Sequence, residues 1–172
     1  GKSTLYEFLT GGDGSRIGCG AQRTTRDSLE RPMVNVPDCV VVDTPGVGAQ
    51  DGKADREAAI KVARRCDLIL WVSANESTQN ETASALVELA DLGKPLVVFL
   101  NCRQRIDTEP RRRRFVRHPE KAFRASAGHW DRLMGFLEES GCLPRHRISG
   151  HALAAFVATV EDDEALYGAS GL

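Results

Sequence analysis

Three short apolar segments that alternate with helical patterns constrain the fold of this chain more than any other feature. They read "CVVVD" at 39–43, "DLILWVSA" at 67–74 and "KPLVVFLN" at 94–101. Residues 53–66 and 78–93, which lie between them, have the pattern of helices. Strands that are apolar throughout and alternate with helices are typical of a parallel sheet covered on both faces. We therefore predict an α/β domain with a mainly parallel sheet, helices on both faces, and buried strands.

The N-terminal segment predicts a helix followed by a loop. Apolar residues recur at helical spacing in residues 4–10, so this segment should be a helix that stops at Gly11 and Gly12. From there to about Arg31 the sequence is polar and rich in glycine, which predicts a mobile loop.

The C-terminal part predicts more elements of the same domain. After an arginine-rich stretch, the sequence favours a helix near 128–141, a short strand near 145–149 and a helix near 152–160. Residues 161–172 are acidic and contain glycine, so we expect a linker or the start of a following region there. The domain should therefore span residues 1–160.

Composition excludes several classes of protein. The 172 residues are 41% hydrophobic and 27% charged with a formal net charge of -1, which argues against a disordered chain and a general nucleic-acid binder. No apolar run reaches the roughly 18 residues needed to cross a bilayer. Five widely spread cysteines without a C-x-x-C pair fit neither a disulfide framework nor a zinc site. We expect a cytoplasmic protein, with any peripheral membrane attachment in regions outside this segment.

Three polar motifs could form one magnesium-nucleotide site. They are "GKST" at 1–4, "QRTTRD" at 22–27 and "DTPG" at 43–46. Backbone N–H groups and a lysine at a helix start bind phosphates, hydroxyl and carboxylate groups bind Mg²⁺, and a glycine N–H reaches a terminal phosphate. Taken singly, each has a simpler interpretation as a helix N-cap, a polar loop or a turn. Their order along one predicted α/β fold favours the site.

These motifs resemble the Era-like and TrmE-like branch of the P-loop GTPases, from Gly1 to about Val160. The resemblance implies a P-loop G domain that binds GTP and GDP, hydrolyses GTP with Mg²⁺ and acts as a switch. Phosphate contacts would come from the "GKST" residues, and catalysis would depend on the lysine, the switch I threonine and the "DTPG" glycine. The implied nucleotide, metal and catalytic residues of these motifs are Gly1, Lys2, Ser3, Thr4, Thr25, Asp43 and Gly46, of which Ser3, Thr25 and Asp43 would bind the metal.

The first motif is only the last part of a complete G-x-x-x-x-G-K-[ST] loop. The family has a core strand and the first loop glycine immediately before this point. We therefore expect the chain to be a fragment of a longer nucleotide-binding parent, with its first strand missing from the middle of the sheet. The predicted GTPase activity is that of the parent.

The base-binding motif departs from the family pattern N-K-x-D. The third apolar segment ends "NCRQ", so Asn101 matches, Cys102 replaces the lysine and Gln104 replaces the aspartate. Loss of a charged acceptor for the base could weaken guanine discrimination by about 1–3 kcal/mol. Ser149 and Gly150, in "SGH", are the candidates for the second base-binding motif of the family. Recognition of ATP with relaxed base specificity is therefore an alternative.

The residue that follows "DTPG" is the second departure from the family pattern, and it concerns hydrolysis. Val47 follows "DTPG" at the position where Ras has the glutamine that orients the attacking water. Relatives with an apolar residue there use a K⁺ ion or self-association, so the resemblance implies K⁺ as a second ion and partners that bind the switch loops. A nucleotide-dependent switch or scaffold that does not hydrolyse GTP is the other alternative.

Residues 103–124 are rich in arginine and could contact RNA, the ribosome or an anionic membrane surface. We favour the simpler interpretation, a solvated and partly helical segment whose charge is balanced by acidic residues elsewhere.

Overall fold

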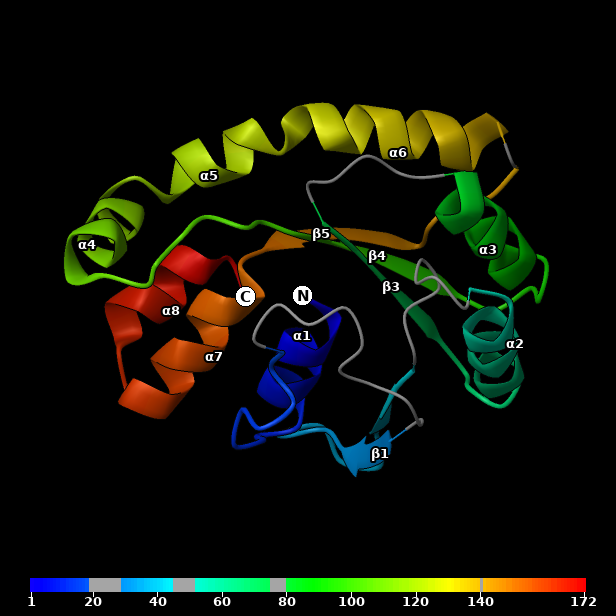
Figure 1. The fold of residues 1–172 in the computed structure, drawn as a ribbon, viewed down its shortest axis with the longest axis horizontal. Helices are drawn as coiled ribbons and strands as arrows, with labels where there is room; N and C mark the ends of the chain where they lie inside the picture. The colour runs from blue at the N-terminus through cyan, green and yellow to red at the C-terminus, as the bar shows by residue number, and fades with distance from the viewer. Residues whose placement is uncertain (19–28, 45–51, 75–79, 140) are drawn as a thin grey trace.

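The computed structural model describes residues 1–18, 29–44, 52–74, 80–139 and 141–172, and its central feature is a parallel sheet (Figure 1). The sheet has the strand order β3 (Ile69–Ala74), β4 (Leu96–Asn101) and β5 (His146–Gly150). The last residues of the three strands, Ala74, Asn101 and Gly150, are aligned across the sheet. Polar groups that follow these strands are therefore brought to one edge.

Helices cover both faces of this sheet. On one face lie α2 (Gly52–Ala63), α3 (Asn80–Ala90) and α6 (Ala127–Glu139), and on the other lie α1 (Lys2–Leu9) and α7 (Ala152–Glu161) (Figure 1). This arrangement confirms the predicted α/β fold class.

The central strand β4 shows how both faces are filled. All six of its residues are buried. Val98 packs with Leu86 of α3 in one cluster, whereas its neighbour Phe99 packs with Leu5 of α1 and Ala152 of α7 in another. Successive side chains of a strand point to opposite faces, so a continuous apolar run is what a sheet covered on both sides requires.

The first apolar segment behaves differently from our prediction. Val40–Asp43 form β2, which pairs antiparallel with β1 (Leu29–Pro32) in a separate two-stranded sheet. Val40 is 56% exposed, and only Asp43 of this strand is fully buried. The predicted parallel, buried strand was thus wrong, because a hairpin on the rim of the fold leaves most of this apolar run at the surface.

The predicted loop after α1 was too long at its C-terminal end. It was expected to reach about Arg31, but β1 begins at Leu29. Pro32 ends this short strand, and proline weakens a strand prediction because it cannot donate to a ladder. In the described residues β2 does not pair with β3.

The C-terminal segment also differs from the expected linker. Glu164–Ser170 form α8, which packs with α7 and with α4 (Glu109–Arg117). Leu166 is fully buried in a cluster with Phe115. The side chain of Asp163 caps α8 by accepting a 2.9 Å hydrogen bond from the backbone N–H of Leu166. Acidic residues here begin a helix, which composition alone does not distinguish from a linker.

The arginine-rich stretch is largely helical, as expected. It contains α4 and α5 (Pro119–Ala125), and Phe115 and Ala122 anchor these helices in the same cluster as Leu166. Among the helices that the structure describes, none is long and apolar enough to span a bilayer.

Candidate functional site

The start of α1 carries the first motif. Gly1 is the N-cap residue, and its carbonyl accepts a 3.0 Å hydrogen bond from the backbone N–H of Leu5. A Cβ atom at Gly1 would lie 3.2 Å from Nδ2 of Asn101, so glycine allows the helix start to approach the end of β4 closely. The first turn contains no acidic residue. Its N–H groups and the positive end of the helix dipole suit an anion.

The motif residues of α1 meet the end of β2 at a buried carboxylate. Lys2 Nζ donates a 2.8 Å hydrogen bond to Oδ1 of Asp43, and Ser3 Oγ lies 3.2 Å from Oδ2. The carboxylate of Asp43 is fully buried, whereas the Lys2 side chain is 35% exposed. Three of the predicted phosphate and metal residues are therefore in direct contact across two separate elements.

Arg16 is a further cation at this carboxylate. Its Nη2 atom lies 3.6 Å from Oδ2 of Asp43, and its guanidinium stacks over the ring of Tyr6 at 5.9 Å. Its Nε atom is buried without a hydrogen-bond acceptor in the described part of the chain. Sequence reasoning missed Arg16 because it lies in a polar segment that carries no motif.

The oxygen atoms at this point fit a magnesium ion. Mg²⁺ binds hard oxygen ligands and often takes only one or two from the protein, with nucleotide phosphates and waters completing the octahedron. The Ser3 hydroxyl and the Asp43 carboxylate are such ligands and lie next to one another. When bound, Mg²⁺ would neutralise phosphate charge beside Lys2.

Asn101 connects the phosphate side of the site to the base side. It is 5% exposed, and its Oδ1 atom accepts a 3.0 Å hydrogen bond from the backbone N–H of Ala152. Because its amide also lies against Gly1, Asn101 joins the end of β4 to the starts of α1 and α7. The candidate base residue and the candidate phosphate residues thus share one edge of the sheet.

The other candidate base residues have side chains engaged within the protein. Cys102 is buried with its Sγ atom 3.3 Å from Oγ of Ser126, and burial raises the pKa of this thiol. Ser149 Oγ accepts a 2.7 Å hydrogen bond from Nε1 of Trp130. Gly150 is buried at the end of β5, and its carbonyl accepts a 2.8 Å hydrogen bond from the N–H of Cys102. Base contacts from these residues stay predictions.

His151 has a structural position that the sequence did not reveal. It is 2% exposed, its Nδ1 atom accepts a 3.1 Å hydrogen bond from the backbone N–H of Ala154, and its Nε2 atom lies 2.7 Å from the carbonyl oxygen of Gln104. Burial lowers the pKa of His151, so the neutral ring is favoured. It therefore caps α7 and holds the loop after β4.

The remaining predicted residues are less informative. Thr4 is buried within α1. Thr25, Gly46 and Val47 lie outside the described residues, so their predicted roles are not tested.

The comparisons with known proteins agree with this geometry. Residues 1–102, more than half of the 172, match the sequence model of the family described as 50S ribosome-binding GTPase. No curated protein matches the chain. The matched segment contains Lys2, Ser3, Asp43 and Asn101, the residues that lie together at the site. The chain therefore belongs to the 50S ribosome-binding GTPase family, a family of P-loop GTPases.

Proposed function

We propose that this protein is a Mg²⁺-dependent switch of the Era-like and TrmE-like branch that binds GTP and GDP and hydrolyses GTP. The observation that carries the proposal is the contact of Lys2 and Ser3 with the buried carboxylate of Asp43. A stability role alone does not require a lysine, a hydroxyl and a carboxylate to converge at an acid-free helix start.

The contacts assign a task to each of these residues. The Lys2 ammonium, now held by Asp43, can turn to a nucleotide phosphate, because a lysine side chain is long and this one is partly exposed. The backbone N–H groups of α1 would bind the same phosphate. Asp43 and Ser3 would hold the ion, and Asn101 would orient the base from the adjacent strand end. Thr25 and Gly46 are proposed to close around the terminal phosphate, as in the family.

The first experiment is binding of a fluorescent GDP analogue with Mg²⁺, in competition with unlabelled GDP, GTP and ATP. Competition by GDP and GTP alone would support guanine specificity despite Gln104. Equal competition by ATP would support the alternative of relaxed base specificity. The Asp43→Asn variant should lose most of the Mg²⁺ dependence of nucleotide binding. The Asp55→Asn variant, which removes an acidic residue from the first turn of α2, should keep this dependence. Equal Mg²⁺ dependence in both variants would contradict the proposed metal ligand.

A single-turnover measurement of phosphate release separates hydrolysis from the alternative of a switch or scaffold that does not hydrolyse GTP. The reaction is run in K⁺ and in Na⁺, because the family resemblance implies an ion requirement. Release that is faster in K⁺ would support K⁺ as a second ion. Tight GTP binding with no release would favour the non-hydrolysing switch. The proposed setting is the cytoplasm, with a protein partner or a second copy bound through the switch loops.

A further inference from the structure

The acidic partners of the arginine-rich stretch are not evenly distributed. Arg105 lies 2.6 Å and Arg111 2.8 Å from carboxylate oxygens of Asp107. On α4, Arg113 pairs with Glu109 at 2.7 Å, and Arg112 pairs with Glu161. These pairs balance much of the charge, as expected for a solvated segment.

Four cations of the same stretch behave differently. In the part of the chain that the structure describes, no carboxylate lies within 4.0 Å of Arg114 and Arg117 of α4 or of Lys121 and Arg124 of α5. Arg114 and Lys121 line one cavity of about 360 Å³, together with Arg103, Gln104, His118, Ala122 and Ala125. Two of these four cations therefore share one cavity.

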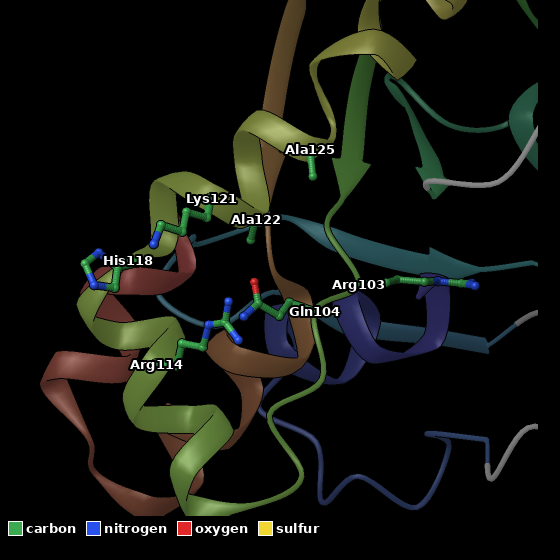
Figure 2. Close-up of a pocket in the computed structure, with 7 residues that line it drawn as sticks. All are labelled: Arg103, Gln104, Arg114, His118, Lys121, Ala122 and Ala125. Carbon is green, nitrogen blue, oxygen red and sulfur yellow. The ribbon is translucent and has the colours of Figure 1, made fainter.

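Figure 2 shows how the polar groups lie. The guanidinium of Arg114 and the amide of Gln104 converge in the hollow, Lys121 and His118 lie at one side, and Arg103 extends away toward α1. His118 has Glu120 3.4 Å from its Nδ1 atom, and the described residues that line the cavity include no carboxylate. Two positive charges and an amide, with no acid among the described lining residues, are groups that suit an anion.

We propose that this cavity binds the phosphate groups of a small phosphorylated ligand. A guanidinium donates two parallel hydrogen bonds to phosphate oxygens, and a lysine adds a mobile point charge, which together suit adjacent phosphates. The amide N–H of Gln104 can donate to a third oxygen. The volume lies at the lower end of the range of about 300–1,000 Å³ found for small-molecule sites, which suits a compact ligand.

The cavity is separate from the phosphate and metal residues of the proposed nucleotide site, although the loop after β4 contributes to both sides. Gln104 lies three residues after Asn101, and its carbonyl is bonded to His151, which caps α7. The cavity opens between α4, α5 and this loop, whereas Lys2 and Asp43 lie where α1 meets β2.

The test is titration of the purified chain with inorganic pyrophosphate at constant ionic strength, followed by calorimetry and by backbone amide shifts in NMR spectra. The Lys2→Ala variant separates the two sites, because it weakens phosphate binding only at α1. We expect pyrophosphate binding to persist in Lys2→Ala, with shifts at Gln104, Ala122 and Ala125. Combining Arg114→Gln with Lys121→Gln should weaken pyrophosphate binding at least about tenfold. The reason is that a hydrogen bond to a charged group contributes more binding free energy than a neutral one.

The matched control is Arg111→Gln with Arg113→Gln, which removes two charges from α4 at positions paired with acids. It should leave pyrophosphate affinity within about twofold. Equal loss in the pocket and control variants would overturn the proposal, because binding would then reflect net charge. Complete loss in Lys2→Ala would also overturn it. Tighter binding of a ten-nucleotide RNA, reduced equally by both double variants, would replace it with an extended RNA-binding surface.

Discussion

Lys2 Nζ lies 2.8 Å from Oδ1 of Asp43, although 41 residues separate them in the sequence. The carboxylate is fully buried and also meets Ser3 and Arg16. A buried carboxylate is costly unless it is paired and hydrogen-bonded. The groups proposed to bind phosphate and metal thus also stabilise one another.

Loss of the Lys2 amine should therefore affect both stability and binding. Lys2→Ala removes the closest cation from Asp43, and we expect the free energy of unfolding to fall by about 1–3 kcal/mol. Affinity for GDP should fall at least about tenfold. Urea unfolding and fluorescent-nucleotide binding measure the two effects. The control is Lys61→Ala, an exposed position near the end of α2, and an equal effect there would contradict the assignment.

Stability should depend on the protonation of His151. Burial lowers its pKa, so the unfolded chain takes up a proton more readily than the folded one. Stability should therefore be fully present above the ordinary pKa of about 6.5 and decrease as the pH falls below it. Chemical denaturation of the native protein and of His151→Gln between pH 5 and 8 measures this contribution.

His146→Gln is the matched control for this dependence, because His146 is exposed on β5. It should keep the native pH profile, whereas His151→Gln should flatten it. The same profile in both variants would contradict a coupling through His151. His151→Gln should also be less stable at pH 8 by about 1 kcal/mol, because the cap of α7 is weakened.

A methyl group at Gly150 should destabilise the protein. The added Cβ would lie 2.9 Å from Cγ of Leu172 and 3.0 Å from Cε2 of Phe99. We expect Gly150→Ala to lower the melting temperature, with a cost of about 1–3 kcal/mol from overpacking. Gly135→Ala is the control, because nothing lies within 4 Å of a Cβ there and alanine favours helix α6 by about 0.5–1 kcal/mol. A neutral Gly150→Ala would show that Leu172 moves freely.

Removal of the Leu166 side chain tests whether α8 is part of the domain. Leu166 is fully buried and packs with Phe115 and Ala158. Leu166→Ala should lower stability by about 2–5 kcal/mol, as for other buried leucines. The exposed Leu153 of α7 provides the control, and Leu153→Ala should cost far less. Comparable small effects at both positions would support the expected linker.

Local sequence patterns were sufficient to predict the central strands and the helices next to them. Apolar runs at β3 and β4 and helical spacing at α2 and α3 are short-range signals, and the structure confirms all four within a few residues. Similar patterns failed where tertiary context decided the outcome. The run at Val40–Val42 pairs with β1 at the rim, and the acidic residues before Leu166 cap a helix.

By itself, the sequence determined the fold class and the chemistry of the candidate residues. Lysine, serine and aspartate in that order, next to apolar strands, are sufficient to predict a phosphate and metal site. Only the tertiary structure decided which residues meet. Arg16 reaches Asp43, His151 holds the carbonyl of Gln104, and Arg114 faces a cavity whose described lining contains no acid. Such contacts join residues that are far apart in the chain. They cannot be predicted from local sequence periodicity, because the packing of the elements sets the distances between these residues.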